Sequence, residues 1–137
     1  SGHVFFKERW YGFDDGLYTG ARLLEILSRA VDGNALLKNL PNAPSTPELN
    51  IKMVEGEPFA LIEKLKNAGD FPGATEIITI DGVRVEYPDG FGLARPSNTT
   101  PVVVLRFEAD NTDALTRIQG AFRQALSAVW PGIQLPF

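Results

Sequence analysis

Apolar residues recur along the chain in two spacings, and each spacing predicts one kind of secondary structure. Over residues 17–31 they follow at intervals of three or four, which is the spacing of one helix face. Asp14-Asp15 before this stretch resembles a helix start, and Asp32-Gly33 after it resembles a stop. Asn34 can cap a further short turn that reaches Leu40. The pattern therefore predicts a helix and a shorter helical turn within the first forty residues.

A run of prolines separates this helical part from the rest of the chain. Residues 41–47 hold three prolines in seven positions, which is typical of a semi-rigid connection between domains. An ordinary loop is the alternative. We expect residues 1–42 to belong to one domain, residues 43–47 to form a hinge, and residues 48–137 to form a second domain.

After the prolines, strand and helix spacings mix in a way that is typical of an α+β domain. Pro58 suits the first turn of a helix that Ala68-Gly69 is expected to close with a left-handed cap, and Asp81-Gly82 is a strong hairpin signal. We expect a mostly antiparallel sheet of four or five strands packed by two helices on one face. The expected strands are 49–53, 77–80, 83–87, 91–95 and 102–107, and the expected helices are 58–68 and 115–129.

The most informative segment is the polar loop between the last two expected strands. Residues 95–101 read RPSNTTP and place one guanidinium, three hydroxyls and one carboxamide close together. An arginine can hold a phosphate through two parallel N–H bonds, and hydroxyl and amide groups can supply further donors. Pro96 and Pro101 favour an extended backbone in the residues before them, so the loop should be stiff. A phosphate-binding loop and an ordinary polar turn both fit this composition.

The sequence around the loop carries a more specific signal. Residues 81–88 read DGVRVEYP and residues 90–101 read GFGLARPSNTTP. This string resembles the last domain of the phosphohexose mutases, the α-D-phosphohexomutase superfamily, and most of all bacterial phosphomannomutase/phosphoglucomutase. Pro96 departs from the family pattern, in which a small residue with an N–H group is common, so one backbone donor is lost. The resemblance implies that the non-reacting phosphate of the substrate is held by Arg95, Ser97, Asn98, Thr99 and Thr100.

The resemblance extends to the start of the chain. Residues 1–6, SGHVFF, and residues 12–16, GFDDG, are similar to the sugar-contacting loop and the following helix start of the family's third domain. It implies sugar contacts for Ser1 and His3, although a lone histidine is also often a solvated surface group. The chain is thus expected to be the end of domain 3, a helical tail of an α/β domain, followed by a domain 4 that is TATA-box-binding-protein-like.

The resemblance also implies an activity for the complete enzyme. Such an isomerase, an intramolecular phosphotransferase, interconverts hexose 1-phosphate and hexose 6-phosphate of glucose and mannose through a bisphosphorylated sugar. It uses Mg²⁺ and glucose 1,6-bisphosphate, with a phosphorylated serine in domain 1 and a magnesium loop in domain 2. Neither a TASHNP-like serine loop nor a DxDxDR run occurs in this sequence. We therefore expect no catalytic residue, bound cofactor or mutase activity in this part alone, with domains 1–3 as its partners.

Two other function classes fit the residues without the resemblance. A stand-alone phosphosugar-binding or anion-binding module would use the same loop without catalysis. An interaction domain would instead need a large exposed apolar patch. The aromatic side chains near the start of the chain are dense enough to resemble a ligand platform. We expect those side chains to pack against the rest of the third domain; they are Phe5, Phe6, Trp10, Tyr11 and Phe13.

Composition narrows these possibilities. The 137 residues are 44% hydrophobic and 22% charged, which is ordinary for a globular domain. The absence of cysteine and the single histidine make disulfides and a zinc site poor hypotheses. A net charge of −4 argues against nucleic acid as a partner. No apolar run could span a membrane and no signal-peptide pattern opens the chain, so we expect a cytoplasmic protein, and we expect it to be a monomer.

Overall fold

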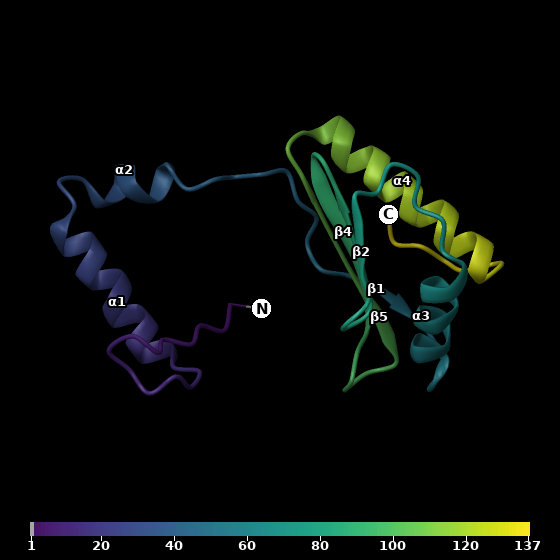
Figure 1. Cartoon of the computed structure of the whole chain (residues 1–137), viewed down its shortest axis with the longest axis horizontal. Coiled ribbons are helices and arrows are strands. Elements are labelled where there is room, and N and C mark those ends of the chain that lie inside the picture. Colours follow the sequence, from purple (N-terminus) through teal and green to yellow (C-terminus); the bar gives the residue numbers. More distant parts are fainter. Residues whose placement is uncertain (1) are drawn as a thin grey trace. The chain divides into compact units, whose positions relative to one another are not determined.

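The computed structural model describes residues 2–137, and the chain divides into two compact units, Ser1–Asn42 and Ala43–Phe137 (Figure 1). The first unit contains α1 (Gly16–Arg29) and α2 (Gly33–Lys38). Asp15 caps α1, because its carboxylate accepts a hydrogen bond from the Tyr18 N–H at 3.0 Å. The helix start predicted at Asp14-Asp15 is therefore confirmed.

The cap of the second helix differs from the prediction. Asp32 is the N-cap of α2, since its carboxylate accepts hydrogen bonds from the N–H groups of Asn34 at 2.9 Å and Ala35 at 3.1 Å. Asn34 lies inside the helix instead of capping it. The backbone of Ala30 is extended, so α1 ends at Arg29, two residues before the predicted end. An aspartate in an extended conformation reaches the first N–H groups of a helix, and this decides the boundary here.

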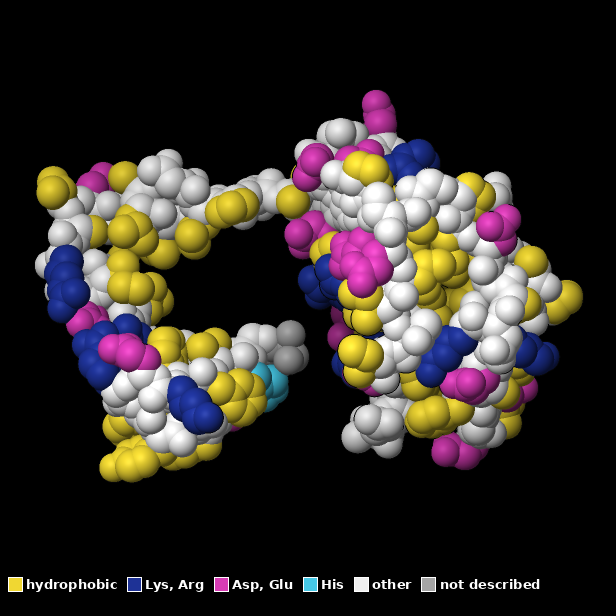
Figure 2. Space-filling view, in the orientation of Figure 1, with side chains coloured by type: hydrophobic (Ala, Val, Ile, Leu, Met, Phe, Trp, Pro, Cys, Tyr) yellow, Lys and Arg dark blue, Asp and Glu magenta, His cyan; other side chains and the backbone are white. Residues whose placement is uncertain are grey.

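The helices of the first unit leave their apolar stripe open to solvent. Neither α1 nor α2 contains a buried residue, and Leu17 and Leu24 are 90% and 67% exposed. Figure 2 shows hydrophobic side chains along both helices. The aromatic residues before α1 pack against one another and against the first turn of the helix, where the Trp10 and Tyr18 rings stack at 4.3 Å between centroids. The first unit thus holds an amphipathic helix without the apolar partner that such a helix usually covers.

The second unit has the predicted α+β architecture. Its five strands form one antiparallel sheet in the order β1-β5-β4-β3-β2, and both helices pack on one face of it (Figure 1). The predicted number of strands and helices and the antiparallel arrangement are confirmed. In chain order the elements are β1 (Leu49–Lys52), α3 (Glu57–Ala68), β2 (Glu76–Ile78), β3 (Val83–Tyr87), β4 (Gly90–Pro96), β5 (Val102–Ala109) and α4 (Thr112–Val129).

The hydrophobic core lies between the sheet and the two helices. Strand alternation supplies one side, because Val83 and Val85 of β3 are fully buried while Arg84 between them is not. Gly92 of β4 allows α4 to approach, since a Cβ at this position would lie 2.3 Å from the Phe122 ring. The helices contribute Leu61, Ile62 and Leu65 from α3 and Ala114, Ile118, Phe122, Ala125 and Leu126 from α4.

Two predicted details of the second unit are wrong. Gly69 closes α3 but is not left-handed, with φ −67° and ψ 129°. A glycine is needed there for space, because a Cβ would lie 2.4 Å from the Leu65 carbonyl oxygen and 2.8 Å from the Phe71 ring. The strand predicted over 77–80 ends at Ile78, and Ile80 is 93% exposed. Pairing of β2 with β3 reaches only Arg84, so the residues after Ile78 have no strand partner.

Candidate functional site

The predicted phosphate loop, residues 97–101, joins the neighbouring antiparallel strands β4 and β5. Pairing of the two strands ends at Pro96 and Val103. The Ser97 N–H then donates to the Val102 carbonyl at 2.9 Å, and the Val102 N–H donates to the Thr100 carbonyl at 2.8 Å. Both ends of the loop are thus fixed to the sheet.

Ser97 organises the interior of the loop. Its hydroxyl oxygen accepts hydrogen bonds from the N–H groups of Thr99 and Thr100, each at 3.3 Å. The same hydroxyl lies 3.0 Å from the Thr100 hydroxyl and 3.4 Å from the Thr99 hydroxyl. The loop is thereby closed on itself, as in a Ser/Thr turn, and its three hydroxyls lie close together.

The loop forms one wall of a hollow of about 90 Å³. The opposite wall is the start of α3, contributed by Glu55, Gly56, Pro58 and Phe59. Pockets for whole small molecules usually measure about 300–1,000 Å³, so this hollow suits one small group rather than an entire sugar. No signal in the sequence indicated this second wall.

The start of α3 has its own cap arrangement. The N-cap Gly56 has φ 86° and no side-chain cap bond, and the Glu57 carboxylate accepts a hydrogen bond from the Val54 N–H at 2.8 Å. The Glu57 carboxylate therefore points toward Val54, and Glu57 does not line the hollow. Glu55 remains an acidic residue on the wall of the hollow.

Arg95 lies beside the loop but does not line the hollow. It is in β4, where its pairing partner is Val104 of β5. Ala94, the preceding residue, is fully buried against the helices, so alternation places Arg95 on the opposite face of the sheet. Its charged neighbour is Asp81, with 3.9 Å between Nη1 of the arginine and Oδ2 of the aspartate. The structure thus gathers Ser97, Asn98, Thr99 and Thr100, and places Arg95 next to them.

The predicted sugar contacts belong to the first unit. Ser1 lies outside the described residues. His3 is exposed, and its Nδ1 is hydrogen-bonded to the Asp14 carboxylate. Asp14 and Asp15 therefore have separate structural partners, as expected for residues at a helix start.

Glu8 and Arg9, in the segment before α1, form ion pairs with residues of that helix. Nη1 of Arg22 donates to Glu8 at 3.0 Å, and Nε of Arg22 lies 3.1 Å from Glu25. The hydrogen bond from Arg22 holds the pKa of Glu8 below its usual value. This network joins the segment before α1 to the helix and serves the first unit's structure.

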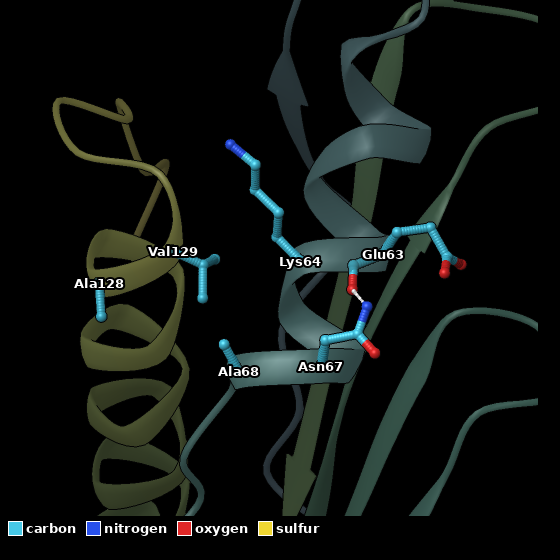
Figure 3. A pocket seen from close by; sticks show the side chains of 6 residues that line it. All are labelled: Glu63, Lys64, Asn67, Ala68, Ala128 and Val129. Atoms are coloured by element: carbon cyan, nitrogen blue, oxygen red, sulfur yellow. Dashed lines mark hydrogen bonds between the residues drawn. The ribbon is translucent and has the colours of Figure 1, made fainter.

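A larger hollow of about 430 Å³ lies between α3 and α4 (Figure 3). Ala68, Ala128 and Val129 make much of its wall apolar, and Asn67 donates a hydrogen bond to the Glu63 carbonyl at 2.8 Å. Its single cation, Lys64, lies 4.6 Å from the centre of the Trp130 ring. The described residues in the wall of this hollow therefore have no hydroxyl groups, whereas Ser97, Thr99 and Thr100 provide three.

The part of the chain that the structure describes contains no group of three or more acidic or histidine residues placed to hold a metal ion. None of the helices in residues 2–137 is long and apolar enough to cross a membrane.

Comparisons with known proteins agree with the fold. The family model described as "Phosphoglucomutase/phosphomannomutase, C-terminal domain" matches residues 48–125. A phosphoglucomutase of Neisseria gonorrhoeae is 60% identical over 96% of this chain, and a phosphomannomutase/phosphoglucomutase of Pseudomonas aeruginosa is 54% identical over all of it. The chain spans about 30% of the length of each of these curated relatives.

A solved structure shows the same fold. The crystal structure of a phosphoglucomutase/phosphomannomutase family protein from Burkholderia thailandensis superposes with a TM-score of 0.91 at 67% identity. The match covers 99% of this chain and 28% of that chain. The chain therefore belongs to the phosphoglucomutase/phosphomannomutase family.

Proposed function

We propose that this chain acts as part of a mutase that interconverts the 1-phosphate and 6-phosphate of glucose and mannose through a bisphosphorylated sugar. The observation that carries the proposal is the cluster of three hydroxyls in the loop that follows Arg95, within the segment that matches the family. Mg²⁺ and glucose 1,6-bisphosphate would serve the complete enzyme through residues outside this chain.

In this proposal the loop holds the phosphate that is not reacting. Ser97, Thr99 and Thr100 supply hydroxyls, Asn98 supplies a carboxamide, and Arg95 supplies the positive charge. A hydrogen bond to a charged group contributes about 1.5–3 kcal/mol, so several of them suffice to anchor one end of the sugar. Holding the substrate by its distant phosphate leaves the other end to react.

The two units would have different tasks. The first unit would be the end of domain 3, with Ser1 and His3 near the sugar, and the second unit would close over the substrate as domain 4. Within the predicted hinge, the Pro44 carbonyl accepts from Ala109 and the Thr46 N–H donates to the Phe107 carbonyl. These residues are attached to β5, so the hinge motion would occur before Pro44.

We further propose a cytoplasmic, monomeric enzyme whose partners in catalysis are its own domains 1–3. A stand-alone anion-binding module is the second candidate, and the core that the second unit encloses by itself favours it. Ligand binding by this chain together with an unchanged kcat/KM of the complete Arg95→Ala enzyme would support that module, whereas a loss of kcat/KM would support the mutase.

The test replaces Arg95 by alanine in the complete enzyme. Loss of the charged contact with phosphate should lower kcat/KM for glucose 1-phosphate by several tens of fold or more. Arg106→Ala is the matched control, because Arg106 is an exposed arginine on β5 and its removal changes the net charge equally.

The same pair of variants tests binding in this chain. Glucose 1-phosphate should shift the amide signals of residues 95–100 in an NMR titration, and Arg95→Ala should abolish the shifts while Arg106→Ala preserves them. A near-normal kcat/KM for Arg95→Ala in the complete enzyme would refute the assignment of this loop.

A further inference from the structure

Arg95 contacts a turn that the family resemblance did not assign to the site, namely Asp81-Gly82. Pairing of β3 with β4 ends at Val83 and Ala94, so Gly82 lies opposite Arg95 at the next position. A Cβ on Gly82 would lie 2.8 Å from the Cα of Arg95 and 2.7 Å from its Cβ. The turn and the arginine are therefore in direct backbone contact.

The same turn brings a carboxylate to the arginine. Asp81 Oδ2 lies 3.9 Å from Arg95 Nη1, and the two side chains are 74% and 38% exposed. Within residues 2–137 no hydrogen bond to the Arg95 guanidinium is formed. The N–H groups of the guanidinium thus stay available to a ligand, while the charge of Asp81 attracts the side chain to the turn.

The attraction to Asp81 holds the Arg95 side chain outside the hollow. The loop's N–H groups and hydroxyls already converge on Ser97, whereas the guanidinium next to Asp81 does not reach the hollow's wall. A phosphate between the loop and Arg95 would draw the guanidinium toward the loop and away from the carboxylate. An exposed ion pair is weak enough to be exchanged for a bidentate contact with phosphate.

We propose that Asp81 is a positioning residue that holds Arg95 beside the loop and competes with phosphate for it. The proposal rests on the proposed function of the loop. Competition lowers the affinity for phosphate and makes release easier. A mutase in which the bisphosphorylated sugar must present each end in turn benefits from a loop that binds phosphate and then releases it.

The test compares two aspartates in this chain. Asp81→Asn removes the competing charge and keeps an Asn-Gly sequence that suits a tight turn. Asp89→Asn is the matched control, because Asp89 also precedes a glycine with positive φ, at the other end of β3, and its carboxylate pairs with Arg117. Each substitution changes the net charge by the same amount.

Two measurements are expected to separate the variants. Without ligand, the Arg95 side-chain Nε–H signal should move in Asp81→Asn and not in Asp89→Asn. With inorganic phosphate, Asp81→Asn should bind about two- to fivefold more tightly, the range that exposed ion pairs allow. The gain should disappear when Arg95→Ala is also present.

An unmoved Arg95 signal in Asp81→Asn would overturn the proposal, as would equal or weaker phosphate binding by that variant. An equal gain in Asp89→Asn would do the same, since it would show a general charge effect. Failure of the underlying function looks different: phosphate affinity would then be unchanged by Arg95→Ala in the otherwise native chain.

Discussion

Gly82 allows Arg95 to lie against the Asp81-Gly82 turn, because a Cβ at position 82 would occupy the same space. Its φ is 105°, a value that other residues rarely adopt, and a Cβ would lie 2.4 Å from the Ala94 carbonyl oxygen. The backbone of β4 can approach the turn only because that Cβ is absent. Asp81, next to Gly82, is thereby brought close to the arginine.

Gly82→Ala should therefore destabilise the second unit more than an ordinary turn substitution does. We expect a loss of about 2–5 kcal/mol in the free energy of unfolding, from the strained φ together with the clash against β4. Gly73→Ala is the control, since Gly73 has φ 80° but would place its Cβ in open space, and it should lose only about 1–2 kcal/mol. Urea denaturation followed by Trp130 fluorescence measures both, and equal losses would contradict the role given to Gly82.

At the scale of elements, the sequence predicted every strand and helix of the second unit, but not which strands are neighbours. Alternation shows that a segment is a strand and does not name its partner. The wall of the hollow depends on that partner: β1 pairs with β5, and the Met53 N–H donates to the Pro101 carbonyl at 3.0 Å. This brings the start of α3 beside a loop about forty residues later in the chain. The composition of residues 95–101 predicted the loop itself, because its donors are contiguous.

The sequence predicts the orientation of Arg95 only in part. Alternation along β4 implies that Arg95 faces away from the helices once Ala94 is known to be buried. Its contact with Asp81, in contrast, depends on the register of β3 against β4. Individual residues therefore predict which donors exist, whereas strand pairing decides which of them meet.

Two glycines, one in α4 and one in β4, should respond to alanine in opposite directions. Gly120 lies inside α4, and a Cβ there would meet nothing within 4 Å. Gly120→Ala should stabilise the second unit by about 0.5–1 kcal/mol through helix propensity. Gly92→Ala should destabilise it by about 1–3 kcal/mol, because the Phe122 ring occupies the space that the Cβ needs. Thermal denaturation monitored by circular dichroism gives both signs, and a destabilising Gly120→Ala would contradict the open surroundings of that residue.

The two units of the whole chain are stabilised by different means. The second encloses an apolar core in which no charged or polar residue is buried. The helices of the first bury no residue, and its ion pairs connect Arg9 and Arg22 with Glu8 and Glu25. Acid can protonate the carboxylates of this network, whereas no carboxylate is buried in the core of the second unit.

Acid should therefore unfold the first unit before the second. The hydrogen bond from Arg22 lowers the pKa of Glu8 in the folded unit below the ordinary value of 4.5. Stability from this contact is present above pH 4.5 and is lost as the pH falls through the lowered folded value. Trp10 reports on the first unit and Trp130 on the second, so each can be followed by fluorescence in a variant that carries phenylalanine at the other position.

The Trp10 signal should change at a higher pH than the Trp130 signal, and Glu8→Gln should weaken the acid dependence of the Trp10 transition. Glu76→Gln, which alters an exposed carboxylate on β2, serves as the control and should leave that transition in place. Coincident transitions for the two tryptophans would contradict independent units. An unaltered Trp10 transition in Glu8→Gln would instead show that the packing of Trp10 on Tyr18, and not the ion pair with Arg22, holds the first unit together at low pH.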